Sequence, residues 1–141
     1  MESGIARSRL DPSSGERMVT LRRQLGVTSF GINQLVLEPR QRGRIHRHAH
    51  QEEVYLVLEG TLTVLVEGEH QVLERGELLR VAPELRRQLV NRGPERAIVL
   101  ALGGAGEHAG RDAEAFTSWE DERGAPPREV PLPEDLPGSV T

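Results

Sequence analysis

The sequence predicts an all-β protein built as a barrel or sandwich. From residue 18 onward it contains about nine short apolar segments, rich in β-branched residues and separated by glycine, proline or polar turns. This short, regular spacing is typical of strands joined by hairpins. With 141 residues, the chain is long enough for one domain with a core of its own, but not for two.

The expected strands follow one another closely along the chain. They cover residues 18–24, 32–38, 46–48, 54–58, 61–67, 70–73, 78–82, 85–91 and 97–102. Arg22 and Arg23 are expected on a solvated edge of the first strand, where charge discourages edge-to-edge pairing. Gly68 and Glu69 are expected to form a two-residue hairpin turn.

The segments outside the strands define the domain organisation. Residues 1–16 are polar and are expected to form a flexible lead-in, and residues 17–106 the barrel. Residues 107–123 are expected to form a short helix that packs Ala115, Phe116 and Trp119 on an outer sheet face. Residues 124–141 contain five prolines and predict an extended tail that is mobile or lies across a neighbouring subunit.

Composition excludes several classes of function. The net charge of −4 gives no basic footprint, so no nucleic-acid partner is expected. All 18 basic residues are arginine, which excludes a Schiff-base lysine, and the absence of cysteine excludes disulfides and thiol chemistry. The short apolar runs and the lack of a signal-peptide core predict no membrane association and a cytoplasmic location.

The stretch of residues 43–60 carries the residues suited to chemistry. His46 and His48 are two apart, so in a strand both side chains point to one face. Glu53 begins the next strand on the same face as Tyr55 and Val57, while alternate residues form an apolar row. Two imidazoles and one carboxylate with open positions suit a divalent transition metal, such as Fe, Mn, Ni, Cu or Zn.

This stretch resembles the first motif of the cupin superfamily, G-x5-H-x-H-x3,4-E-x6-G. His46, His48, Glu53 and Gly60 match it, whereas Arg40 stands at the leading glycine. The resemblance implies a double-stranded β-helix, also called a jelly roll, with the His, His and Glu ligands inside the barrel. It also implies a homodimer that pairs through a sheet face. The apolar row Val54, Leu56 and Leu58 suits either such a face or the second sheet of the sandwich.

The second cupin motif, which should supply a fourth histidine, is altered. Gly76 to Pro83 resembles its opening and Asn91 its end, but Arg87 stands where the family usually has histidine. A guanidinium cannot bind a metal, although it can hold an anion bidentately. Gln88 could reach the metal only through a register slip. His50 has the parity of His46 and His48 and is the other candidate for a fourth ligand.

The altered motif leaves the roles of two arginines open. Arg87, and Arg80 if its strand phase is inward, could clamp a substrate carboxylate. Alternatively, both side chains could line the barrel mouth in solvent. Beyond the metal ligands, the residues near enough to act as catalytic acids or bases are Glu52, His50 and Tyr55.

Two hypotheses of function follow from different classes of protein. In the first, the chain is a metal-dependent enzyme, such as a dioxygenase, isomerase or decarboxylase, acting on a small carboxylate-bearing substrate. In the second, the barrel binds or senses a small molecule, with or without metal, and catalyses nothing. Fold does not choose between them, because one fold serves many functions.

Overall fold

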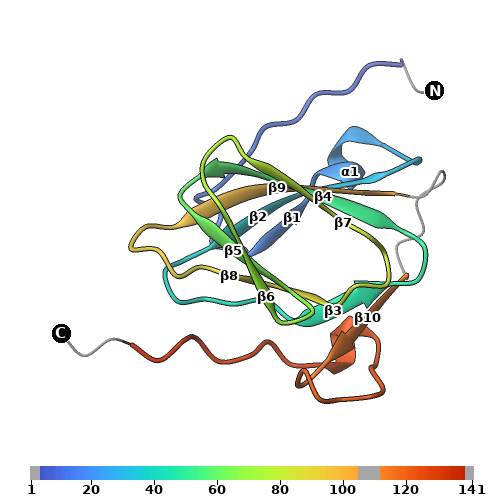
Figure 1. Ribbon diagram of the computed structural model, residues 1–141. Helices are drawn as coiled ribbons and strands as arrows, with labels where there is room; N and C mark the ends of the chain where they lie inside the picture. The colour runs from blue at the N-terminus through green and yellow to red at the C-terminus, as the bar shows by residue number, and fades with distance from the viewer. Residues whose placement is uncertain (1–3, 105–111, 139–141) are drawn as a thin grey trace.

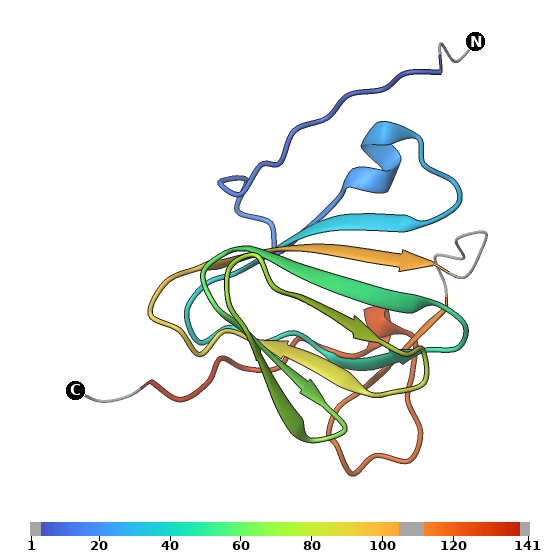
Figure 2. The ribbon, with the colours of Figure 1, turned by 45° about the horizontal axis from the view of Figure 1, so that its top comes forward.

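The computed structural model describes residues 4–104 and 112–138 and contains two five-stranded antiparallel sheets (Figures 1 and 2). The first sheet has the strand order β1-β2-β9-β4-β7 and the second β10-β3-β8-β5-β6. The strands are β1 (Met18–Thr20), β2 (Gly31–Leu37), β3 (Ile45–His48), β4 (Glu52–Glu59), β5 (Leu62–Val66), β6 (Glu69–Leu73), β7 (Leu78–Val81), β8 (Arg87–Val90), β9 (Ala97–Gly104) and β10 (Ala113–Phe116).

The path of the chain gives the jelly roll predicted from the sequence. Apart from the β1–β2 and β5–β6 pairs, consecutive strands belong to opposite sheets, so the chain repeatedly crosses from one sheet to the other. The all-β double-stranded β-helix is therefore confirmed. Within the described residues, no helix is long and apolar enough to cross a membrane.

The inner faces of the two sheets enclose the core. On β4, Tyr55 and Val57 are buried and point inward, as the alternation predicted. They pack against residues of both sheets, among them Leu62, Val64 and Val99. The opposite row of β4, Val54, Leu56 and Leu58, is half-buried on the outer face, so it does not pack against the second sheet.

Two expectations near turns were wrong. The first strand ends at Thr20, and residues 21–25 form helix α1 (Leu21–Leu25), which ends at Gly26 in a left-handed conformation with φ of 72°. The hairpin turn between β5 and β6 consists of Glu67 and Gly68, one residue earlier than expected, because Val66 pairs with Glu69. Both turn residues have positive φ, as a two-residue turn between twisted strands requires.

The helix expected within residues 107–123 is absent from its described part. Residues 113–116 form β10, an edge strand paired with β3, and residues 107–111 lie outside the described residues. The turn that follows is stabilised by Asp121, whose carboxylate accepts hydrogen bonds from the backbone N–H groups of Thr117 and Ser118. Pairing with β3 thus outweighs the helical propensity of this segment. Phe116 is buried beneath the guanidinium of Arg86, 3.7 Å from the ring centroid.

The C-terminal tail is attached to its own barrel, and in Figure 1 it runs from β10 beneath the barrel to the opposite end. It contains a short 3-10 helix, η1 (Pro127–Glu129), and is otherwise extended. The Nε–H groups of Arg42 and Arg44 donate to the backbone oxygens of Glu134 and Val130, at 2.6 and 2.5 Å. The tail therefore forms part of the fold.

Two positions of the first cupin motif adopt left-handed backbone. Arg40, at the leading glycine position, has φ of 72°, a left-handed conformation that glycine adopts more readily than arginine. Gly60 has φ of 77°, and a Cβ there would collide with the carbonyl oxygen of Arg96 and lie 3.0 Å from Cα of Ala97. The closing glycine is therefore required for close packing as well as for its φ.

Gly60→Ala should destabilise the fold more than Gly76→Ala. Gly76 has φ of 85° but a Cβ there meets no atom within 4 Å, so its substitution tests the left-handed conformation alone, at a cost of about 1 kcal/mol. The collision at Gly60 should add about 1 kcal/mol or more. Urea unfolding followed by circular dichroism measures both losses, and equal losses would contradict the steric account.

Candidate metal centre

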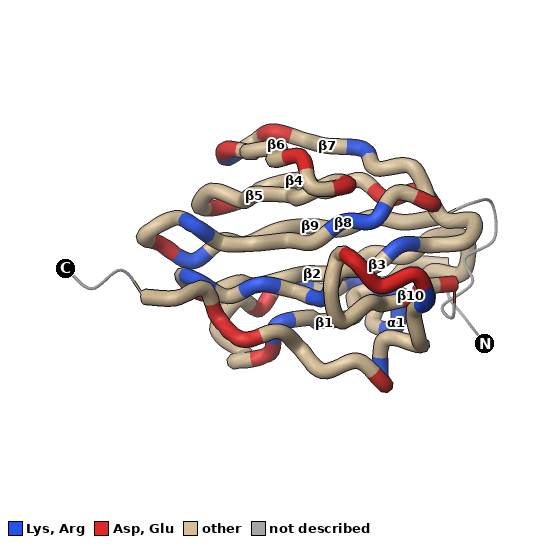
Figure 3. Tube along the Cα trace, turned by 60° about the horizontal axis from the view of Figure 1, so that its bottom comes forward, with Lys and Arg blue, Asp and Glu red and all other residues tan. Residues whose placement is uncertain are grey.

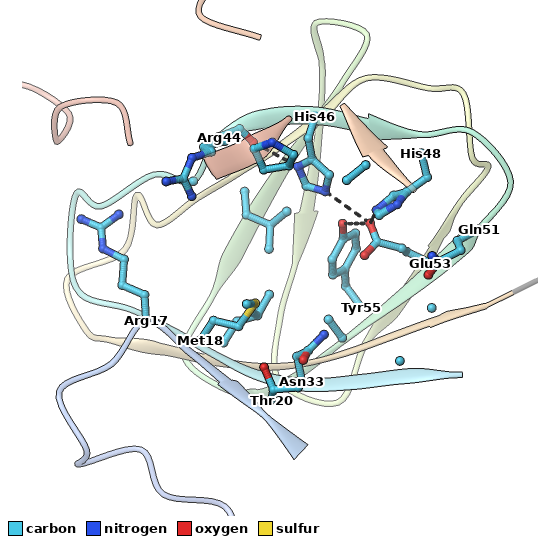
Figure 4. Close-up of a pocket in the computed structure, with 18 of the residues that line it drawn as sticks. Arg17, Met18, Thr20, Asn33, Arg44, His46, His48, Gln51, Glu53 and Tyr55 are labelled. Atoms are coloured by element: carbon cyan, nitrogen blue, oxygen red, sulfur yellow. Dashed lines mark hydrogen bonds and ion pairs between the residues drawn. The ribbon is translucent and has the colours of Figure 1, made fainter. Parts of the chain in front are cut away.

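His46, His48 and Glu53 meet inside the barrel because the chain changes sheets between them. β3 presents both imidazoles on its inner face, and β4, in the other sheet, presents Glu53 toward them (Figure 4). Oε1 of Glu53 lies 3.4 Å from Nε2 of His46 and 3.2 Å from Nε2 of His48. The ligand atoms of all three residues lie within 4.8 Å of one another, close enough to hold one metal ion.

In each imidazole, the nitrogen that faces away from Glu53 contacts an oxygen atom. Nδ1 of His46 contacts the backbone oxygen of Arg44 at 3.1 Å. Nδ1 of His48 lies 3.5 Å from Oδ2 of Asp112. Such contacts orient metal-binding histidines and favour protonation of Nδ1, which leaves the lone pair of Nε2 available to bind a metal. Both Nε2 atoms therefore face Glu53 in the orientation that a shared ion needs.

Asp112 is a site residue that sequence reasoning missed. Its side chain is 4% exposed, and it accepts hydrogen bonds from the backbone N–H groups of His50 and Gln51 at 2.9 to 3.1 Å. Burial would raise the pKa of Asp112, but these hydrogen bonds outweigh it and lower the pKa. Asp112 comes close through the pairing of Ala113 with His48, which no spacing in the sequence indicates.

The donor set fits a metal ion. Both ring nitrogens of His48 are buried and have no hydrogen bond within the described residues, although both contact carboxylate oxygens. A buried imidazole without a hydrogen-bond partner is costly unless another group binds it. Two imidazole nitrogens and a carboxylate suit several divalent transition metals.

Glu53 carries the negative charge of the centre. Burial would raise the pKa of Glu53, but the close contacts and charge of His46 and His48 outweigh it and hold the pKa well below its usual range. The hydroxyl of Tyr55 donates to Oε1 of Glu53 at 2.6 Å. Burial, reinforced by the charge of Glu53, raises the pKa of Tyr55 well above 10.0, so the phenol stays protonated at neutral pH.

Arg87 points inward, as strand alternation predicted, but it is not a solvated residue of the barrel mouth. It pairs with His46 across β3 and β8 and is 0% exposed. Its Nη2 donates to the oxygen of Ala82 at 2.6 Å and its Nη1 to that of Pro83 at 3.4 Å. Nη1 also lies 3.8 Å from Oε1 of Glu53. Arg87 therefore supports Glu53 and does not line the cavity.

The other candidates lie away from the centre. Gln88 points outward and donates to the oxygen of Gly43, so the register does not slip. The side chain of His50 is 83% exposed and contacts Asp112. Glu52 and Arg80 form an ion pair on the outer face, 2.5 Å apart, which excludes both from the barrel interior. Tyr55 alone among the predicted acid–base candidates faces the cavity.

The centre lies in a cavity of about 820 Å³. Its walls include aliphatic residues of both sheets, and the tail contributes Pro127 and Leu132. Four arginines, Arg17, Arg22, Arg23 and Arg44, also line it. Arg22 and Arg23 of the first predicted strand were expected on a solvated edge, but helix α1 brings them to the cavity.

Comparison with known proteins agrees with this geometry. Residues 33–103 match the family model described as Cupin domain. The chain is 32% identical over 99 residues to tetracenomycin polyketide synthase protein TcmJ of Streptomyces glaucescens, covering 70% of this chain and 60% of that protein. The chain thus spans less than two thirds of the length of this relative.

Solved structures share the fold. A cupin protein from Bacteroides fragilis superposes with a TM-score of 0.65 at 21% identity, covering 74% of this chain and 86% of that one. A protein from Silicibacter pomeroyi described as a sugar phosphate isomerase from a cupin superfamily superposes with a TM-score of 0.64 at 20% identity, covering 92% and 90%. At these identities the likeness concerns the fold alone.

Asp112→Asn should weaken metal binding about 10- to 100-fold, because the amide orients His48 without the carboxylate's charge. Competition titration with a chromogenic chelator measures the affinity. Asp121→Asn is the matched control, since Asp121 stabilises the turn after β10 and is remote from the cluster. An equal effect of both substitutions would contradict the role assigned to Asp112.

Arg87→His should bind metal about tenfold more tightly or better, because it replaces a buried cation beside Glu53 with a neutral donor. Arg87→Met separates the two effects, since it removes the charge and adds no nitrogen ligand. The same chelator competition provides the affinities. Binding by Arg87→His no tighter than by the parent would show that position 87 does not face the ion.

Proposed function

The chain belongs to the cupin domain family, and from this premise we propose that it binds a divalent transition metal through His46, His48 and Glu53 and holds a small oxygen-bearing molecule at that metal. The observation that carries the proposal is the convergence of both Nε2 atoms on one carboxylate oxygen at the wall of a cavity. Three protein ligands leave positions open to a second molecule.

The protein groups around the centre have separate tasks. A metal bound there, whether Fe, Mn, Ni, Cu or Zn, would supply Lewis-acid or oxygen-activating chemistry. Asp112 and the Arg44 carbonyl orient the imidazoles, and Arg87 steadies the charge of Glu53. The hydroxyl of Tyr55 gives its one hydrogen to Glu53, so toward a ligand near the metal its oxygen would serve as a hydrogen-bond acceptor.

The reaction class we propose is that of a dioxygenase, isomerase or decarboxylase. The similarity to a polyketide synthase protein supports a polyketide as the substrate class, since polyketides carry carbonyl and hydroxyl oxygens that can chelate a metal. A cavity of about 820 Å³ lies within the range of small-molecule sites and accommodates a ligand of several rings. Aliphatic walls suit its carbon skeleton.

A second candidate is a non-catalytic binding protein, and Tyr55 is the observation that favours it. A phenol whose pKa is raised well above 10.0 donates hydrogen bonds but does not abstract protons at neutral pH. Among the described residues that line the cavity, Glu53 is the one carboxylate, and it belongs to the cluster. Catalysis would then depend on the metal for its activating power.

Association as a homodimer is part of the proposal. The outer row Val54, Leu56 and Leu58 is half-buried, and Leu78, on the neighbouring strand β7, is 61% exposed. An apolar sheet face of this kind is a surface that a second copy of the chain would cover.

Protein purified without chelator should contain near-stoichiometric transition metal, and His48→Ala should lose it because one of three ligands is gone. Elemental analysis measures both. His70→Ala, exposed on β6, is the control and should keep its metal. A parent that stays metal-free after reconstitution with Fe, Mn, Ni, Cu and Zn would refute the proposal. Turnover of a polyketide by the loaded protein, as opposed to thermal stabilisation alone, distinguishes enzyme from binding protein.

A further inference from the structure

The charged side chains that line the cavity are unbalanced. Arg17, Arg22, Arg23 and Arg44 face a single carboxylate, that of Glu53, and the buried Arg87 lies against the same carboxylate. The chain as a whole has a net charge of −4, and acidic and basic residues are interspersed along the backbone (Figure 3). The excess of cations is therefore local to the cavity.

Two of the arginines lie at the end of the cavity away from the metal cluster. Figure 4 shows Arg17 and Arg44 at one end and His48, Glu53 and Tyr55 at the other. Arg22 and Arg23 follow Thr20, which the pairings of β1, β2, β9 and β4 place level with Tyr55, so helix α1 begins at the end of the sheet that carries Glu53. A ligand that contacted both the metal cluster and helix α1 would need two separate polar groups.

Two of the arginines are free to bind such a ligand. Arg17 is held by Asp135 at 3.8 Å and by the oxygen of Arg42, and Nε of Arg44 donates to the tail at Val130. By contrast, the guanidinium groups of Arg22 and Arg23 have no hydrogen-bond or ion-pair partner among residues 4–104 and 112–138. Adjacent on helix α1, they offer unused N–H donors to the cavity.

We propose that the ligand is an organic acid that places its metal-binding oxygens at His46, His48 and Glu53 and its carboxylate at Arg22 and Arg23. This inference rests on the proposed function and deepens it by assigning the second end of the ligand. It also transfers the carboxylate-binding role, expected of Arg87, to arginines that line the cavity. Arg44 adds positive charge to the same cavity.

Charge gives the physical reason for an acid. A divalent ion adds two positive charges to a cavity that already has more arginines than carboxylates, and a neutral ligand would leave that excess uncompensated. A carboxylate accepts paired hydrogen bonds from the N–H groups of a guanidinium. These charged hydrogen bonds are stronger than hydrogen bonds between neutral partners. Because Arg22 is half-buried and Arg23 exposed, the attraction is moderate and weakens with salt.

Dihydrocaffeic acid and its primary amide test the inference, since they share a catechol that chelates metal and differ only in the acidic group. Zinc-loaded protein is used because zinc does not oxidise the catechol. Calorimetric titration should show that the parent binds the acid at least about tenfold more tightly than the amide. In the Arg22→Gln/Arg23→Gln variant this preference should fall to about twofold or less, with the affinity for the amide unchanged.

Arg75→Gln/Arg92→Gln is the matched control, because both arginines are exposed outside the cavity lining and the change in net charge is the same. It should keep the preference for the acid. Equal binding of acid and amide by the parent, binding of neither, or a preference that survives in Arg22→Gln/Arg23→Gln would overturn the inference. The proposed function fails separately, if the amide binds metal-free and zinc-loaded protein equally well.

Discussion

The structure of the site depends on keeping one partly buried carboxylate, that of Glu53, ionised. A carboxylate withdrawn from water stays charged only where donors or cations replace its hydration. Glu53 receives a hydrogen bond from Tyr55, contacts both imidazoles, and has the guanidinium of Arg87 within 3.8 Å. All of these contacts reach the same oxygen atom, Oε1, so the four neighbours and Glu53 form a single electrostatic unit. A change at any of them alters the charge balance of the whole.

Arg87 changes how the residues around Glu53 can bind a metal. A histidine at position 87, as the family motif has it, would be a neutral ligand competing for the same ion. The arginine is a fixed cation that has two backbone oxygens as partners and needs no ion. Glu53 can therefore remain ionised without a metal, and a metal that binds meets fewer protein ligands. A metal bound by the three remaining ligands would keep open coordination positions on the cavity side.

Features of the site that depend on neighbouring residues in the sequence could be predicted, and features that depend on long-range strand pairing could not. Alternation within β3, β4 and β8 was enough to place His46, Glu53 and Arg87 on inner faces, because neighbouring side chains in a strand point to opposite sides. Asp112 was missed because it reaches His48 through a pairing between β10 and β3 that is distant in sequence. The segment carrying it was expected to be a helix, and only tertiary pairing makes it a strand.

Helix α1 was missed for a related reason. Residues 18–24 have the composition of a strand, yet the chain turns after Thr20, and the left-handed conformation of Gly26 ends the helix five residues later. The attachment of the tail was equally hidden, because the groups that accept the hydrogen bonds are backbone oxygens. Backbone acceptors are present at every residue, so no pattern of side chains marks them.

Because the tail is attached through its backbone oxygens, its side chains can vary during evolution. Arginine side chains hold the tail by its peptide oxygens, which most substitutions leave in place. Leu132, which lies between two of these anchored residues and forms part of the cavity wall, is therefore free to change size or polarity without releasing the segment. Mutations in this stretch can reshape the wall while the metal ligands, on β3 and β4, stay untouched. The tail is thus a region in which descendants of this chain can acquire new ligand preferences at little risk to the fold.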